Sequence, residues 1–328
     1  MNEVEQLKKD VNKKYGADVI VSATDVLDRN RQVIRTTPAL DFALHGVPEG
    51  SWVLLSGPPK CGKTTLALQM AANAQQQFNK PIFYGNIEHR VDEKALSGIH
   101  GLDVAAISVI ESKPNKILMA QDFLQEFTNI IKTVPGCVLI IDSTSALCAE
   151  KEYTEDITSQ ARNEGPKLLA TFCRKMAAVV PVQRATLIII QHLIANTSGY
   201  GSPFYEDGGN KIQYQADVKL RCSSWQKWNR VTADDATRIG QVVNWQIINS
   251  ALGPPGAKIQ GYLRYGYGVD DVKEYISLGL DLGLIDKGGA WYTFGELKSQ
   301  GEEKLRAALL ENPEKLEELK VAVNAHMS

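Results

Sequence analysis

The chain has 328 residues and a formal net charge of −2, and its 44% hydrophobic and 23% charged residues are typical of a globular protein with one large core. No apolar run reaches the ~18 residues that a membrane span needs, and the charged start lacks the apolar stretch of a secretory signal. The five cysteines are scattered, which fits a reducing compartment better than a zinc site. Because a lone nucleic-acid-binding domain is usually more basic, any DNA would bind a local surface or one built by assembly.

The first part of the chain predicts an alternation of helices and strands. Residues 3–15 have helical composition, and residues 38–45 predict a helix that ends at Gly46. Apolar runs bounded by turn residues predict buried strands at 51–56, 81–86, 137–142 and 185–191. Segments of helical composition lie between them at 64–77, 117–133 and 166–179. Such alternation predicts right-handed crossovers and a mostly parallel, twisted sheet.

The last part of the chain predicts an extension of this sheet and a separate small domain. Residues 218–222 and 242–248 look like strands that extend the sheet in antiparallel fashion. From about residue 269 the pattern changes to helices and short loops, and Asn312 is a suitable N-cap for an amphipathic helix. We therefore expect an α/β fold with an N-terminal helix and oligomerisation segment over 1–34, a core over 35–269 and a small C-terminal α/β domain over 270–328.

A phosphate-binding loop follows the first predicted strand. The run Gly57-Pro-Pro-Lys-Cys-Gly-Lys-Thr64 matches G-x-x-x-x-G-K-[ST] between an apolar strand and a helix, which is the context that this motif requires. Its glycines let backbone N–H groups face phosphate oxygens, and the helix N-terminus adds partial positive charge. Lys63 would reach the β- and γ-phosphates of ATP, and the Thr64 hydroxyl would ligate Mg²⁺. The residues expected to contact the nucleotide here are Gly57, Pro58, Pro59, Lys60, Cys61, Gly62, Lys63, Thr64 and Thr65.

Two carboxylates follow other predicted strands. Asp142 ends the apolar run Val138–Asp142 and would orient the Mg²⁺ shell. Any buried strand can end in Asp, so the distance downstream of the phosphate loop is what supports this interpretation. Glu88 follows the strand over 81–86, where strand ends line the nucleotide crevice of such a sheet. A carboxylate there can position and deprotonate the attacking water, although a helix-capping or surface role stays open.

Together these motifs resemble the RecA family of recombinases, including its phage UvsX-like branch, from about Arg35 to Pro313. The matching stretches are Ile34–Leu44 before the first strand, Glu88–His89, Asp142–Ser143, the Gly-Gly-Asn segment 208–220 and the Gly-Ala-Trp-Tyr segment 282–292. The last two are far more specific than a phosphate loop, because other ATPases of this fold lack them. The resemblance implies a RecA-like P-loop ATPase core that hydrolyses ATP with Glu88, Lys63 and His192 as catalytic residues.

The resemblance also implies two DNA-binding loops, near 152–164 and over 194–209. The second is rich in Gly and Ser with interspersed aromatics, which suits wrapping and stacking on single-stranded DNA, although composition alone also fits a surface loop with incidental aromatics. Lys167 and Arg174 lie seven residues apart, on one face of the helix that follows the first loop. The implied DNA contacts are Arg162, Lys167, Arg174, Tyr200, Phe204, Tyr205, Gly208, Gly209 and Asn210.

Several positions bear on nucleotide sensing. The resemblance implies that His192 senses the γ-phosphate and connects directly to the second DNA loop. Asp92 and Tyr265 match adenine contacts of the family, whereas Ala95 stands where the family has a stacking tyrosine. The lysines that reach a neighbouring subunit's ATP have no counterpart in Asn249–Pro255, so Lys258 and Arg264 become candidates for that role.

The function that the sequence predicts is ATP-dependent DNA strand exchange. The protein would form helical filaments on single-stranded DNA and pair it with duplex DNA, in the cytoplasm of a bacterial cell or of a phage host. A single-strand-binding protein and a loading mediator could assist, and no membrane would be involved. One alternative is a non-catalytic paralogue that regulates a recombinase, which the missing lysines favour and the retained Lys63, Glu88 and Asp142 oppose. Another is a ring-forming helicase-type or signalling ATPase, which the two family-specific segments oppose.

Overall fold

The computed structural model describes residues 3–27, 30–156, 164–196, 204–207, 210–231 and 236–327, which divide into compact units over 1–32 and 33–328. The first unit contains α1 (Glu3–Tyr15) and α2 (Ala23–Leu27). The helix predicted over 3–15 is therefore confirmed. Acidic side chains in its first turn and lysines in its last turn complement the helix dipole.

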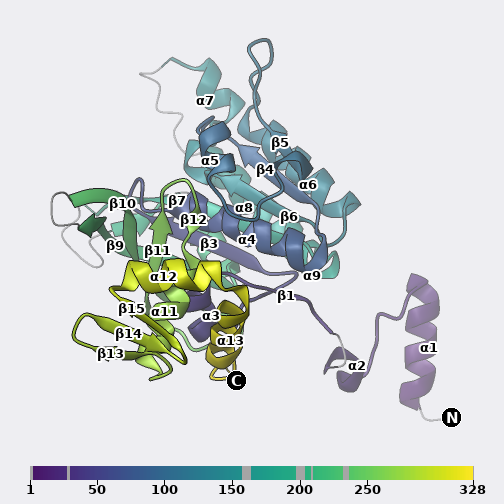
Figure 1. Ribbon diagram of the computed structural model, residues 1–328. Helices are drawn as coiled ribbons and strands as arrows, with labels where there is room; N and C mark the ends of the chain where they lie inside the picture. Colours follow the sequence, from purple (N-terminus) through teal and green to yellow (C-terminus); the bar gives the residue numbers. More distant parts are fainter. Residues whose placement is uncertain are drawn as a thin grey trace. The chain divides into compact units, whose positions relative to one another are not determined.

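A large mixed sheet forms the centre of the second unit (Figure 1). Its order in the described chain is β12-β11-β10-β9-β3-β7-β6-β4-β5, and β8 pairs with β7. The strands are β3 (Trp52–Gly57), β4 (Ile82–Asn86), β5 (Ile107–Ile110), β6 (Val138–Asp142), β7 (Thr186–Ala195), β8 (Phe204–Glu206), β9 (Val218–Val231), β10 (Ala236–Asn249), β11 (Lys258–Arg264) and β12 (Gly268–Val269). A separate pair joins β1 (Val33–Ile34) to β2 (Val47–Pro48).

The extension of the sheet differs from the expectation in two ways. β9 runs parallel to β3, with Val53 opposite Val218, so the antiparallel part begins only with β10. Both β9 and β10 are 14 residues long, far beyond the apolar runs that predicted them. Beyond Arg221, where the pairing of β9 with β3 ends, β9 continues to pair with β10 as a hairpin. Backbone hydrogen bonds hold this hairpin extended without any alternation of apolar and polar residues. The mostly parallel sheet predicted for the central strands is confirmed.

Helices cover both faces of this sheet. One apolar cluster packs α4 (Lys63–Phe78) against one face, and another packs α6 (Ala120–Thr133) and α8 (Glu164–Met176) against the other. The helix expected over 117–133 begins only at Ala120, because the Asp122 carboxylate accepts the Met119 N–H and caps it. The helix expected over 166–179 ends at Met176. The remaining helices are α3 (Pro38–Leu44), α5 (Glu93–Ser97), α7 (Glu150–Thr154), α9 (Val179–Val182) and α10 (Asn210–Gln215).

The C-terminal part of the second unit has its own apolar core. It contains α11 (Asp271–Asp281), the antiparallel strands β13 (Asp286–Gly288), β14 (Trp291–Phe294) and β15 (Leu297–Gln300), then α12 (Glu302–Glu311) and α13 (Pro313–Asn324). The Asn312 side chain accepts the Lys315 N–H at 3.2 Å, so the predicted N-cap of α13 is confirmed. The three strands make this part α/β rather than purely helical.

This topology gathers the chemistry-bearing residues at one edge of the sheet. The central parallel strands all end at the same side, so the segments that follow β3, β4, β6 and β7 meet there. The segments after β3 and β4 supply the phosphate loop and Glu88, and the ends of β6 and β7 themselves supply Asp142 and His192.

Candidate active site

The phosphate loop links β3 to α4 with glycines where neighbouring atoms come closest. Gly62 is the N-cap of α4 and has φ 92°, in the left-handed region that favours glycine. A Cβ atom at Gly62 would lie 2.1 Å from Cδ1 of Leu263, and one at Gly57 would lie 2.7 Å from Cβ of Cys222. Packing against β9 therefore requires glycine at position 57, and the left-handed backbone favours it at position 62, in agreement with the motif.

The Lys63 ammonium lies inside this loop. Its Nζ donates to the carbonyl oxygens of Gly57 at 3.0 Å and Pro58 at 2.9 Å, and the residue is buried. From the neighbouring strand β10, the Gln241 amide donates to the Lys60 carbonyl at 3.1 Å and fixes the outer side of the loop. The positive charge is thus held where the motif places a phosphate group.

Thr64 and Asp142 meet at the start of α4. The Thr64 hydroxyl donates to Oδ2 of Asp142 at 2.8 Å, and the Tyr84 hydroxyl donates to the same oxygen at 2.6 Å. Burial, followed by the negative charge of Asp142, raises the pKa of Tyr84, so Tyr84 remains a donor. A hydroxyl and a carboxylate beside a phosphate loop are the oxygen donors that Mg²⁺ prefers, with phosphates and waters completing its shell.

Glu88 lies at the centre of a polar cluster formed by three strand ends. Its Oε1 accepts a hydrogen bond from the Ser143 hydroxyl and lies 2.7 Å from Nε2 of His192, while Oε2 lies 2.8 Å from Nη1 of Arg90. Burial by itself raises the pKa of Glu88, but the hydrogen bonds from Ser143 and His192 more than offset it and hold the pKa below its usual value. Glu88 is therefore ionised near neutral pH and able to accept a proton.

A cleft of about 800 Å³ opens over these groups. Its phosphate end is lined by Pro59 to Thr65, Glu88, Asp142 and His192, and its other end by Ala95, Ile99, Tyr265, Gly266 and Gly268. Gly57 and Pro58 lie beneath it as the carbonyl acceptors of Lys63. Asp92 does not line this cleft, because its carboxylate accepts the Ala95 N–H at 2.8 Å as the N-cap of α5.

The sequence interpretation missed the cations and aromatics that strands β9 and β10 bring to the cleft. Arg238 lies between two rings, 5.7 Å from the centroid of Trp225 and 5.2 Å from that of Tyr265, and both Trp225 and Arg238 line the cleft. No local signal marks these residues, because they lie more than 150 positions after the motif. Arg264, a candidate for contacting a neighbour's ATP, is paired with Asp270 and, at 2.8 Å, with Glu303, so its charge is already engaged.

The residues expected to contact DNA are only partly within the described chain. Lys167 and Arg174 are exposed on α8, and Lys167 lies 3.5 Å from the Glu164 carboxylate. Phe204 and Tyr205 lie in β8 and are about half exposed. Asn210 is the first residue of α10. Arg162, Tyr200, Gly208 and Gly209 lie outside the described residues.

The start of the second expected DNA loop is regular structure. Ile194 and Ala195 still belong to β7, where they face Tyr205 and Phe204 of β8. The segment 194–209 is therefore anchored at its base by a pair of antiparallel strands. The strand predicted to end at Gln191 therefore continues to Ala195, and pairing with β8 keeps this continuation extended.

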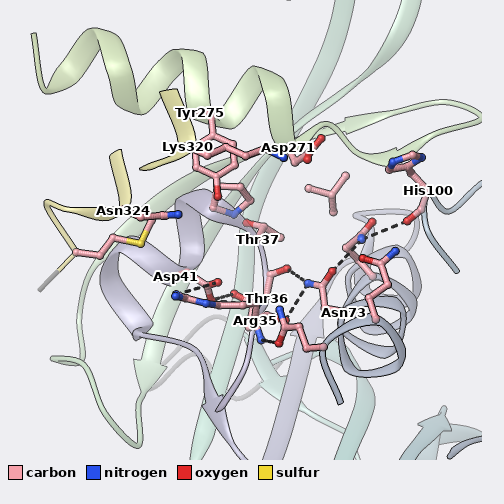
Figure 2. Close-up of a pocket in the computed structure, with 16 residues that line it drawn as sticks. Arg35, Thr36, Thr37, Asp41, Asn73, His100, Asp271, Tyr275, Lys320 and Asn324 are labelled. Carbon is pink, nitrogen blue, oxygen red and sulfur yellow. Dashed lines mark hydrogen bonds and ion pairs between the residues drawn. The ribbon is translucent and has the colours of Figure 1, made fainter. Parts of the chain in front are cut away.

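A second cavity, of about 330 Å³, lies between α3, α4 and the C-terminal helices (Figure 2). Its polar groups largely satisfy one another. Asp41 accepts the Thr36 N–H at 3.0 Å, and the Asn73 amide donates to the Arg35 and Thr36 carbonyls at 2.9 and 2.7 Å. Burial raises the pKa of Asp41 to about 6. We interpret this cluster as the structural anchor of the segment 34–44.

The sequence as a whole matches two family descriptions in tandem, the RecA N-terminal domain over residues 2–270 and the RecA C-terminal domain over 273–328. The chain belongs to the RecA family. The family comprises DNA-dependent ATPases that carry out recombination, and the motifs that indicated it meet in the cleft just described.

Individual relatives agree over nearly the whole chain. Protein RecA of Oleidesulfovibrio alaskensis is 30% identical over 92% of this chain and 85% of that protein. Protein RecA of a Sulfurovum species is 28% identical over 96% and 89%, and that of Thermus thermophilus is 28% identical over 98% and 93%. Among the helices of the described chain, none combines the length and apolar character that crossing a membrane requires.

Proposed function

We propose that this chain is an ATP-dependent DNA strand-exchange recombinase that forms helical filaments on single-stranded DNA and pairs it with a duplex. The observation that carries this proposal is the Glu88 cluster. An ionised carboxylate, held by Ser143 and His192, lies beside a phosphate loop and one strand away from the segment 194–209. Such a cluster connects a hydrolytic centre to the expected DNA-binding segment within a RecA-family chain.

The roles at the phosphate end follow from the contacts. Lys63 would neutralise the β- and γ-phosphates of ATP, and Glu88 would orient a water and accept its proton. Thr64 and Asp142 would hold Mg²⁺, which when bound supplies neutralisation of phosphate charge. Tyr265 offers a half-exposed ring for the base at the other end of the cleft.

The DNA-binding side rests on the family together with exposed groups of this chain. Phe204 and Tyr205 would stack on bases, and Lys167 and Arg174 would neutralise phosphates along the strand. A single-strand-binding protein and a loading mediator are the further partners that we propose, and the cytoplasm is the proposed site of action. The proposed parts of the chain are 1–34 for assembly, 35–269 for ATP and DNA, and 270–328 as the small domain.

Electron microscopy of negatively stained protein with single-stranded DNA and a non-hydrolysable ATP analogue tests this proposal. Helical filaments that disappear with ADP are the expected result, together with ATP hydrolysis that increases on adding DNA. Closed rings would indicate the helicase-type alternative. Absence of any assembly, with hydrolysis unaffected by DNA, would indicate a regulatory paralogue.

A further inference from the structure

Glu206 is an acid in a place where an exposed acid would hinder DNA binding. It ends β8, within the segment 194–209 that is expected to contact the phosphate backbone. A carboxylate facing DNA there would repel the phosphates. The Glu206 side chain is instead only 3% exposed, so its role must lie inside the protein.

Three side chains from two strands meet the Glu206 carboxylate. Its Oε1 lies 3.1 Å from Nζ of Lys219 and accepts from Arg221, whose Nε is at 3.2 Å. The Ser56 hydroxyl donates to the same oxygen at 3.3 Å. Burial by itself raises the pKa of Glu206, but Arg221 and Lys219 more than offset it, so the carboxylate stays ionised.

These partners connect the DNA segment to the nucleotide site. Ser56 directly precedes Gly57, the first residue of the phosphate loop, and lies opposite Arg221 in the pairing of β3 with β9. On its other side, Glu206 lies opposite Leu193 of β7, next to His192. The N–H of Asp207 donates to the His192 carbonyl at 3.0 Å.

A buried amide lies beside this cluster. Gln191 lies opposite Ser56 in the pairing of β3 with β7 and is fully buried. Neither its Oε1 nor its Nε2 has a hydrogen-bond partner in the described part of the chain. A buried amide without partners is costly. Any rearrangement of the strand ends that gave Gln191 a partner would lower this cost.

We propose that Glu206 is a positioning residue that transmits the state of the nucleotide site to the DNA-binding segment 194–209. This inference rests on the proposed function. A γ-phosphate that displaces the phosphate loop also displaces Ser56, and the carboxylate held by Ser56 and Arg221 carries β8 with it. His192 moves the end of β7 in the same event, so both ends of the segment respond together.

The test measures the affinity for fluorescent single-stranded oligo(dT) with a non-hydrolysable ATP analogue and with ADP. Glu206→Gln keeps the size of the side chain and removes its charge. We expect it to reduce the ratio of the two affinities by roughly 10- to 100-fold, because one hydrogen bond to a charged group contributes about that much. Asp207→Asn is the matched control, because it neutralises the next residue, whose carboxylate pairs with no cation in the described chain. We expect Asp207→Asn to keep the wild-type ratio.

A second variant addresses folding. Glu206→Gln leaves the buried Lys219 and the partly buried Arg221 without their counter-ion, and an unpaired buried charge is strongly destabilising. The double variant Glu206→Gln with Lys219→Gln removes the two most buried charges, one of each sign, and leaves Arg221, whose side chain is 24% exposed, able to reach solvent. It still lacks the link, so it should fold and also lose the difference between the two affinities. If either folded variant keeps the full ratio, or if Asp207→Asn loses it equally, the proposal is overturned. If the wild-type protein binds no DNA with either nucleotide, the proposed function fails first, and this inference fails with it.

Discussion

The two ends of the nucleotide cleft are built in different ways. The phosphate end is formed by consecutive residues of one loop and by carboxylates at strand ends, and hydrogen bonds hold Lys63, Asp142 and Glu88 in place there. The base end is assembled from α5, β9, β10 and the turn after β11, and its best-defined contacts are those of a cation between two rings. Directional contacts to charge fix position strongly, whereas ring–cation contacts contribute less and tolerate change. We therefore expect the rate of ATP hydrolysis to depend on the phosphate end. The base end should contribute only modestly to the affinity for ATP.

Removal of the charge inside the phosphate loop should have the largest effect. Lys63→Ala eliminates a buried ammonium that the carbonyls of Gly57 and Pro58 hold in place. We expect productive ATP binding to be lost and hydrolysis to fall to the background level, as measured by phosphate release. Lys132→Ala, which removes an exposed lysine of α6 that does not line the cleft, is the control. Unchanged hydrolysis in Lys63→Ala would contradict the assignment of the phosphate end.

The Glu88 carboxylate should affect turnover without affecting binding. Glu88→Gln cannot accept a proton, and loss of a general base typically slows a reaction ~10²–10⁴-fold. We expect bound ATP, slow release of phosphate and long-lived filaments on DNA. Normal turnover would mean that Glu88 has only a packing role.

The pH dependence of hydrolysis sharpens this prediction. Because the pKa of Glu88 is held below its usual value, the rate should stay constant as pH falls from neutral and should drop only below the ordinary carboxyl range. Ser143→Ala removes one of the hydrogen bonds that lower this pKa. Its acid limb should therefore shift to higher pH, and an identical profile in both proteins would contradict the role of Ser143.

His192 should affect the link between nucleotide and DNA. Its ring contacts Glu88 at 2.7 Å, and its carbonyl accepts the Asp207 N–H at the base of the segment 194–209. His192→Ala should still bind ATP. The ratio of its DNA affinity with ATP analogue to that with ADP should fall by roughly 10- to 100-fold, because a hydrogen bond to a charged group contributes about that much. DNA affinity with ATP analogue and with ADP measures this preference. A full preference in the mutant would make His192 a structural residue.

The smallest effect should come from the base end. Arg238→Ala removes a cation between two partly exposed rings, which contributes ~0.5–1 kcal/mol at such sites. The expected result is a rise in KM for ATP of about 2- to 5-fold, larger than any change in kcat, because this contact is made equally in the ground and transition states. A loss of kcat comparable to that of Glu88→Gln would mean that the two ends do not differ as we describe.

The same contrast explains how much the sequence could predict. The phosphate loop, Asp142 and Glu88 could be recognised because each follows its own apolar strand, and the parallel topology then brings the strand ends together. Arg238 and Trp225 could not be recognised, because they lie in parts of β9 and β10 that are rich in polar residues and extend beyond the pairing of β9 with β3. Asp92 illustrates the opposite error, since a match to a family pattern does not reveal that a carboxylate is used as a helix cap.

The same reasons explain how much of the sheet could be predicted away from the nucleotide site. Element types in the apolar centre could be predicted, whereas the parallel placement of β9 could not, because it depends on which strand edge remains open beside β3. Glu206 forms ion pairs with Lys219 and Arg221, which are two residues apart and so share one face of β9. The helix α10 separates them from Glu206 in the sequence. A sequence pattern indicates faces of a strand but not which distant acid meets them.

The location of Trp225 has a practical consequence. Indole emission shifts with the charge and water around the ring, and Trp225 lines the cleft while Trp52 and Trp245 are buried in the apolar core. A nucleotide that enters the cleft changes the surroundings of this ring directly. The unlabelled protein therefore carries its own optical indicator of occupancy, and comparison of its spectrum with that of Trp225→Phe isolates the signal.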